Sequence, residues 1–144
     1  MAAFAAAIRP IGSPRPWSRS IPSHAEEATV WRWFDAFNSR DLEGMLACMH
    51  PYVDFHPLRL HGLDSAYSGH AGVREWFGEL LRLEHHHRIE LTEVRASSDG
   101  KLVAAGTLRT VDPSGPASFW ALERFEGGMI IAAHHFLSDR FHLR

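Results

Sequence analysis

A histidine and an aspartate stand two residues apart where a predicted strand must end. In the stretch VDFHP, which begins at Val53, apolar residues alternate with Asp54 and His56. Alternate residues of a strand share a face, so the two polar side chains are expected to lie together. Pro57 has no amide proton for a sheet ladder, so the strand stops there. An imidazole beside a carboxylate can exchange protons near neutral pH, which makes His56 the first candidate base and Asp54 its candidate partner. A strand-end histidine bonded to a loop carbonyl and a solvated aspartate are the simpler alternative.

Other reactive groups give weaker signals. Three consecutive histidines, His85 to His87, suggest a metal site, but consecutive residues of a helix or strand cannot converge on one ion, and the chain has no H-E-x-x-H motif. Cys48 lies among apolar neighbours of a predicted helix, which is typical of an inert core thiol. A G-x-S-x-G motif and a phosphate-binding glycine loop are both missing. We therefore predict neither a metal site nor nucleophilic catalysis.

Composition excludes several classes of function. The chain has 144 residues, enough for one domain, and a net charge of −2, which gives no positive field for nucleic acid or an anionic membrane. A single cysteine cannot form an internal disulfide and is typical of a reducing compartment, so we expect a cytoplasmic protein. Five tryptophans and nine phenylalanines indicate a roomy core or pocket.

Residues 1–24 differ from the rest of the chain. They hold four prolines and three arginines but no acidic residue. Such a segment cannot bury a core, and we predict a flexible arm ahead of a domain at 25–144. An arginine-bearing, acid-free start also resembles a transit peptide, but a dispensable tail is the interpretation we favour.

Apolar spacing predicts helices in the first part of the domain and strands in the second. Apolar residues at i, i+3, i+4 and i+7 from Val30 predict a first helix. Asp41 can cap a short second helix. The same spacing in GHAGVREWFGELLRL, which begins at Gly69, predicts a third. Strands are predicted at 52–56, 87–96, 101–111, 118–126 and 129–137. Helices followed by an antiparallel meander define an α+β fold. Both faces of the late strands carry apolar residues, which favours a homodimer formed through the sheet.

Four segments together resemble the nuclear transport factor 2-like superfamily, and within it the SnoaL-like and ketosteroid isomerase-like members. They are FNSRDLEGM, VDFHP, YSGHAGVREWF and RFEGGMIIAAHHF. The resemblance covers roughly Ala25 to Asp139. It implies a cone, in which a strongly curved sheet wraps around about three helices and encloses a deep apolar pocket. It does not fix the reaction, because the superfamily includes isomerases, cyclases, epoxide hydrolases, dehydratases and binding modules.

The resemblance also places individual residues. The isomerases carry a general-base aspartate just before a proline at the end of the first strand, and His56 holds that position here. Their oxyanion-hole tyrosine corresponds to Trp33, and their second acidic donor falls near Trp120 or Ala121. An indole N–H donates a hydrogen bond but is no acid near pH 7, which argues against steroid isomerisation.

Two further predictions concern the late strands and the aromatic residues. SnoaL-like cyclases use an aspartate and a histidine near the late strands, and the last strand here offers His134 and His135. Adjacent strand residues point to opposite faces, so only one can line a pocket, and we favour His135. Aromatic residues are candidates for the pocket wall, although such residues more often form a plain core: Trp33, Phe37, Tyr52, Trp76 and Trp120.

The sequence therefore predicts a cofactor-independent enzyme that acts on a small apolar molecule by general acid–base chemistry. An isomerase, a cyclase, a dehydratase and a hydrolase all remain open. The alternative is a non-catalytic module of the same fold that binds a small molecule or mediates dimerisation. Convergence of two of His56, Asp54 and His135 inside a closed cavity would favour the enzyme over the binding module.

Overall fold

The computed structural model describes residues 24–58, 66–83, 86–110 and 115–137. The three predicted helices are present as α2 (His24–Asn38), α3 (Leu42–Ala47) and α4 (Gly69–Arg82). The strands are β1 (Met49–His56), β2 (Tyr67–Ser68), β3 (Arg88–Ala96), β4 (Leu102–Arg109), β5 (Ala117–Glu126) and β6 (Met129–Leu137). Apart from His24, which opens α2, the predicted N-terminal arm lies outside the described residues, as does His85 of the three consecutive histidines.

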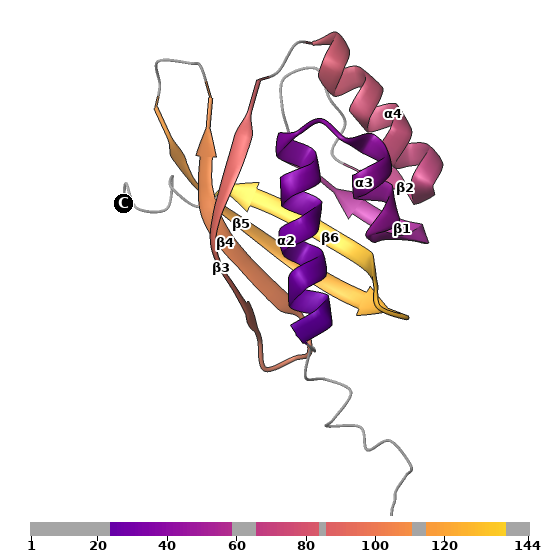
Figure 1. Ribbon diagram of the computed structural model, residues 1–144, viewed down its shortest axis with the longest axis vertical. Coiled ribbons are helices and arrows are strands. Elements are labelled where there is room, and N and C mark those ends of the chain that lie inside the picture. Colours follow the sequence, from indigo (N-terminus) through magenta and orange to yellow (C-terminus); the bar gives the residue numbers. More distant parts are fainter. Residues whose placement is uncertain (1–23, 59–65, 84–85, 111–114, 138–144) are drawn as a thin grey trace, which may run out of the picture.

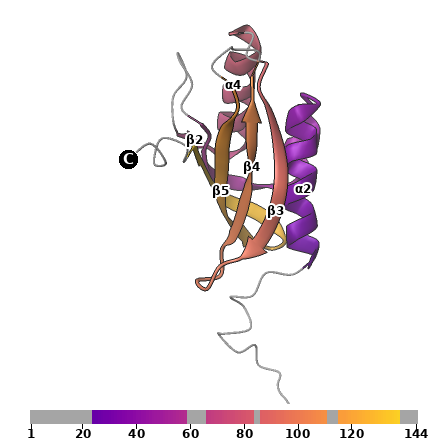
Figure 2. The same cartoon turned by 90° about the vertical axis from the view of Figure 1, so that its left-hand side faces the viewer.

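The strands form one curved sheet in the order β2-β1-β6-β5-β4-β3. Helices α2 and α4 lie against its concave side (Figure 1), and the opposite face of β3, β4 and β5 carries no helix of the described chain (Figure 2). The predicted α+β cone is therefore confirmed. The sheet is not wholly antiparallel, however, because β1 pairs in parallel with β6.

Each helix follows from its own sequence signals. Helix α2 buries the predicted apolar face, including Val30, Trp33, Phe34 and Phe37. The carboxylate of Asp41 accepts a hydrogen bond from the backbone nitrogen of Gly44 at 3.0 Å, which caps the short helix α3 as predicted.

Strand β1 ends at His56, as the following proline predicts, but it begins at Met49, earlier than expected. It includes Pro51, which lies where the register between β1 and β6 shifts, between Met49 and Asp54. A proline is tolerated in a strand at such an irregularity, because no ladder hydrogen bond is required of it there. The side chains of β1 alternate between the two faces of the sheet, and Val53 and Phe55 are on the buried face.

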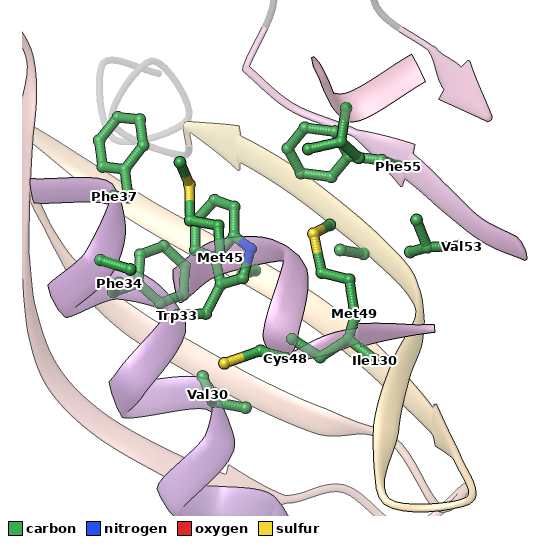
Figure 3. Packing of buried hydrophobic residues seen from close by; sticks show 14 of the residues in the cluster. Val30, Trp33, Phe34, Phe37, Met45, Cys48, Met49, Val53, Phe55 and Ile130 are labelled. Atoms are coloured by element: carbon green, nitrogen blue, oxygen red, sulfur yellow. The ribbon is translucent and has the colours of Figure 1, made fainter. Parts of the chain in front are cut away.

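The core fills the space between the helices and the concave face of the sheet. Trp33 lies at its centre and stacks on Phe37, with ring centroids 5.8 Å apart, while Met45, Met49 and Val30 pack around it (Figure 3). The side-chain amide of Asn38 bonds both backbone groups of Ile89, at 2.8 Å each, and thereby fixes the end of α2 to the start of β3.

Gly106 provides a test of the sheet geometry. A Cβ atom at this position would collide with the backbone carbonyl of Glu90 and lie 2.9 Å from the Cα of Leu91, beside the irregularity in β3. Because backbone atoms cannot yield as a flexible side chain can, Gly106→Ala should lower the free energy of unfolding by about 1–3 kcal/mol, as other overpacked sites do.

Gly78 in α4 is the matched control, since an added Cβ there meets nothing within 4 Å. Gly78→Ala should raise the free energy of unfolding by up to about 1 kcal/mol through helix propensity. Urea denaturation of both variants measures the two effects. A neutral Gly106→Ala would show that β3 and β4 are not paired in this register.

Candidate functional site

An apolar cavity lies between the helices and the concave face of the sheet. It encloses about 20 Å³, room for about one water molecule. Aromatic and aliphatic side chains form most of its wall, and two histidines, His87 and His135, interrupt it. The remaining lining residues are Trp33, Phe37, Pro57, Leu58, Trp76, Leu80, Ile89 and Leu108.

Aromatic rings surround His135 on β6. The ring centroids of Trp33 and Phe34 lie 5.4 and 5.5 Å from that of the imidazole. The ring centroids of Phe55 on β1 and Phe119 on β5 lie 5.6 and 5.3 Å from that of the imidazole. Only 6% of His135 is exposed, so its imidazole is surrounded by the core and the cavity.

Glu123 on β5 provides the carboxylate that faces this histidine. Its side chain is 1% exposed, and its Oε2 lies 3.7 Å from Nε2 of His135. Neither carboxylate oxygen, nor His135 Nε2, has a hydrogen-bond partner among the described residues. A buried charge without hydrogen bonds is costly, so this pair is an unusual feature for an apolar core.

Two indole N–H groups are also left unused beside the cavity. Nε1 of Trp33 and Nε1 of Trp76 are buried and have no hydrogen-bond partner within the described parts of the chain. The two rings stack with centroids 6.5 Å apart, and both residues line the cavity. Buried donors are usually satisfied, so these two are available to an acceptor on a bound molecule.

Half of the predicted site residues meet at this cavity. His135, Trp33, Phe37 and Trp76 line it. The choice of His135 over His134 agrees with the structure, in which His134 lies on the opposite face of β6. Their roles toward a ligand stay a prediction.

The other four predicted residues lie elsewhere. His56 and Asp54 share a face of β1, as expected, but it is the face opposite the buried Val53 and Phe55, so the predicted place of His56 in the apolar pocket is wrong. Tyr52 is on the same outer face and is 82% exposed. Trp120 alternates with the buried Phe119 and Ala121, and it therefore points away from the cavity.

His56 and Asp54 instead form a polar cluster with His134 on the outer face of the sheet. Nε2 of His56 lies 3.0 Å from Oδ1 of Asp54, and its ring stacks on that of His134, with centroids 4.8 Å apart. These residues line an open hollow of about 250 Å³ together with Lys101 and Arg124. Burial, the charge of His56 and the charge of His135 lower the pKa of His134, and Asp54 opposes them.

Neither the pairing of Glu123 with His135 nor the place of His87 in the cavity wall is predicted from the sequence. Glu123 is two residues from Ala121 and four from Phe119, so one charged residue follows two apolar ones on a single face of β5. That pattern signals a buried carboxylate once the inner face is known. The other face, with Trp120 and Leu122, is equally apolar, so the sequence leaves the inner face undecided.

The remaining predictions concern Cys48, metals and membranes. Burial raises the pKa of the Cys48 thiol, although Arg32 acts in the opposite direction, which agrees with an unreactive thiol. Within the described residues, no three side chains of the metal-binding types lie close enough to hold an ion. None of the described helices has the length and apolar character needed to cross a membrane.

Fold and cavity together define a cone-shaped α+β protein with a small apolar pocket. The family model of the SnoaL-like domain matches residues 30–133. The chain therefore belongs to the SnoaL-like family, as the four segments of the sequence predict. A search of curated proteins gives no match.

Solved structures share the fold. An NTF2-like protein of unknown function from Burkholderia pseudomallei is 25% identical, with a TM-score of 0.67 over 83% of this chain and 95% of that one. TerC, co-crystallised with polyporic acid, is 23% identical, with a TM-score of 0.67 over 83% and 96%. A protein of unknown function with a cystatin-like fold from Xanthomonas campestris is 18% identical, with a TM-score of 0.68 over 81% and 92%.

The outer cluster provides a test of the charges around His134. His56→Gln removes a neighbouring positive charge and should raise the pKa of His134 toward its ordinary value, whereas Asp54→Asn removes a negative charge and should lower it further. NMR titration of the His134 ring protons measures both shifts. Tyr52→Phe, a change on the same strand that alters no charge, should leave the pKa of His134 as it is in the unmodified protein. Shifts of the same sign in both charge variants would contradict the arrangement.

Proposed function

We propose that the protein is a small-molecule enzyme that works by general acid–base chemistry at His135, without a cofactor, as an isomerase, cyclase, dehydratase or hydrolase. The observation that carries this proposal is the buried pair of His135 and Glu123, 3.7 Å apart, beside a cavity that His135 lines. Pairs of titratable groups inside an apolar cleft are typical of catalytic sites.

In this proposal the two residues have different roles. Nε2 of His135 faces the carboxylate, so Nδ1 is the nitrogen left to exchange a proton with a bound molecule. Glu123 does not line the cavity and acts as a positioning residue, because its carboxylate favours the tautomer with the proton on Nε2. The surrounding rings exclude water, which strengthens each electrostatic contact.

The two unused indole N–H groups suggest how a substrate is oriented. Trp33 and Trp76 can donate hydrogen bonds to an oxygen of the substrate, such as a carbonyl, while His135 moves a proton at a neighbouring atom. The indoles stabilise developing negative charge but do not supply a proton. The co-crystal of TerC with polyporic acid supports a small organic ligand for this fold.

A non-catalytic binding module of the same fold is the second candidate. It is favoured by the placement of the predicted residues, because only one of His56, Asp54 and His135 lies in the cavity. Glu123 is a second titratable group beside His135, but it does not line the cavity and can influence a ligand only through His135. The two candidates differ in whether a bound compound is converted.

Replacement of the adjacent histidines separates these candidates. The protein is incubated with a small-molecule extract, and untargeted mass spectrometry follows compounds that are converted to products of equal mass or differing by one water. His135→Gln should slow the conversion at least about a hundredfold, because general acid–base catalysis contributes that much. Glu123→Gln should slow it less, because it removes the orienting charge and keeps the imidazole.

His134→Gln is the matched control, since His134 adjoins His135 in sequence but lies on the outer face, and it should leave the rate unchanged. Conversion at an undiminished rate by His135→Gln would remove His135 from the mechanism. A compound that binds in proportion to the protein and is never converted would establish the binding module instead.

We also propose that the protein forms a homodimer through the outer face of the sheet. Trp120 and Phe136 are cross-strand partners on that face, and Phe136 is 36% exposed. Leu122 lies on the same face, beside Arg124 and His134. Large apolar side chains grouped on an exposed sheet favour association with a second apolar surface.

Phe136→Asp should convert this dimer to a monomer, because each copy would place a carboxylate in the apolar interface. Sedimentation velocity at micromolar concentration measures the change. Leu81→Asp is the control, since Leu81 is 50% exposed on α4, and it should leave the dimer intact. A monomeric unmodified protein, or a dimer that both variants preserve, would overturn the sheet interface.

A further inference from the structure

A second hollow shares a wall with the apolar cavity. It measures about 240 Å³ and is lined by Asn38, Arg40, His86, His87 and Arg88. His87 lines both spaces and is the residue that they share. His87 is also only partly buried, whereas Trp33, Trp76 and most other residues of the cavity wall are buried.

The lining of this hollow is basic. Four of its five lining residues carry basic side chains, and none of the five is acidic. Glu90 lies near Arg88 on β3, but its carboxylate is already paired, because Oε1 accepts a hydrogen bond from Nε of Arg109 at 2.7 Å. An anion in the hollow would therefore meet an attractive field.

Arg40 is held in place by hydrogen bonds to two segments of the chain that are far apart in sequence. Its guanidinium donates to the backbone carbonyls of Phe37 at 2.8 Å and His87 at 2.9 Å. It also stands 4.6 Å from the ring centroid of Phe37, which lines the cavity. Arg40 therefore contacts Phe37 at the end of α2 and His87, and both of these residues line the apolar cavity.

The backbone of Arg40 has a cost that this arrangement must offset. Its φ of 56° lies in the left-handed region, where glycine or asparagine is favoured after a helix. Such strain is of the order of 1 kcal/mol and persists where the surroundings hold the residue. Burial lowers the pKa of Arg40, and the positive charge of Arg88 lowers it further, which indicates that the two cations repel each other.

We propose that this hollow is an anion-binding subsite, which holds the carboxylate or phosphate group of a ligand whose apolar part enters the cavity. The inference rests on the proposed function in one respect, since it takes the cavity to be the ligand site. It gives the substrate class as an amphipathic molecule with a negatively charged end. It also assigns His86 and His87, part of the three-histidine run, to anion recognition and not to a metal.

Arg88 is the residue through which the subsite can be tested. It is exposed at the start of β3, so its replacement leaves the packing of the core intact. Its planar guanidinium can make two parallel hydrogen bonds to a carboxylate or phosphate. Arg95 lies on the same strand and is also exposed, but its Nε pairs with Glu93 at 3.0 Å, so Arg95→Gln is a matched control for Arg88→Gln.

Two fluorescent probes with the same aromatic body distinguish the charge from the cavity. Anilinonaphthalene sulfonate carries an anionic group, and phenylnaphthylamine does not. Arg88→Gln should weaken binding of the sulfonate probe roughly five-fold and leave the neutral probe unaffected, because a partly exposed charge pair contributes up to about 1 kcal/mol. Arg95→Gln should change neither. Added salt should weaken only the sulfonate probe.

Competition identifies the anionic group. Displacement of the sulfonate probe by benzoate, but not by phenyl phosphate, assigns a carboxylate, and the reverse assigns a phosphate. Equal effects of Arg88→Gln on both probes, or no effect on either, would overturn the subsite and leave the cavity as a ligand site. Failure of both probes to bind the unmodified protein would overturn the cavity and the subsite together. Turnover measured with His135→Gln remains a separate test of catalysis.

Discussion

Alternation of side chains along β6 separates two histidines that are neighbours in sequence, and both the packed core and the proposed chemistry depend on this separation. His135 points into the core and His134 to the outer face. Because β1 lies parallel to β6 with His56 opposite His134, the register also directs His56 outward. A slip of one residue would exchange the two faces of a strand and place charged groups in the core. The buried Val53 and Phe55 of β1 oppose such a slip.

The buried pair of His135 and Glu123 is not explained by stability. Desolvation of two ionisable groups can exceed their mutual attraction, and well-packed apolar residues are often as stable in such places. The separation of 3.7 Å and the lack of further hydrogen bonds from the Glu123 carboxylate to described residues make this pair a weak contributor. A costly arrangement held in a well-packed core is what acid–base chemistry in a dry site requires.

The sequence was sufficient to predict the three helices and all the strands except the short β2, but not the faces of all the strands. Helix α2 and strand β6 have strong local patterns, and Pro57 fixes the end of β1, so these predictions are confirmed. The parallel contact between β1 and β6 joins segments far apart in the chain and leaves no local signal. The outward direction of His56 depends on that contact, which is why its expected place in the cavity was wrong. Both faces of β5 are apolar, so the sequence did not reveal that Glu123 points inward.

The size of the cavity constrains how a ligand can enter it. A space of about 20 Å³ holds a water molecule and no organic substrate, so binding of the proposed ligand requires part of the wall to move. Trp33 and Trp76 are fixed in a stack of rings, and Asn38 ties the end of α2 to Ile89. Leu58 and His87 are the two lining residues that are only partly buried, so displacement of their side chains costs the least packing. His87 also borders the basic hollow, and a ligand admitted at this wall would therefore pass the positive charge of Arg88 before its apolar part reached His135.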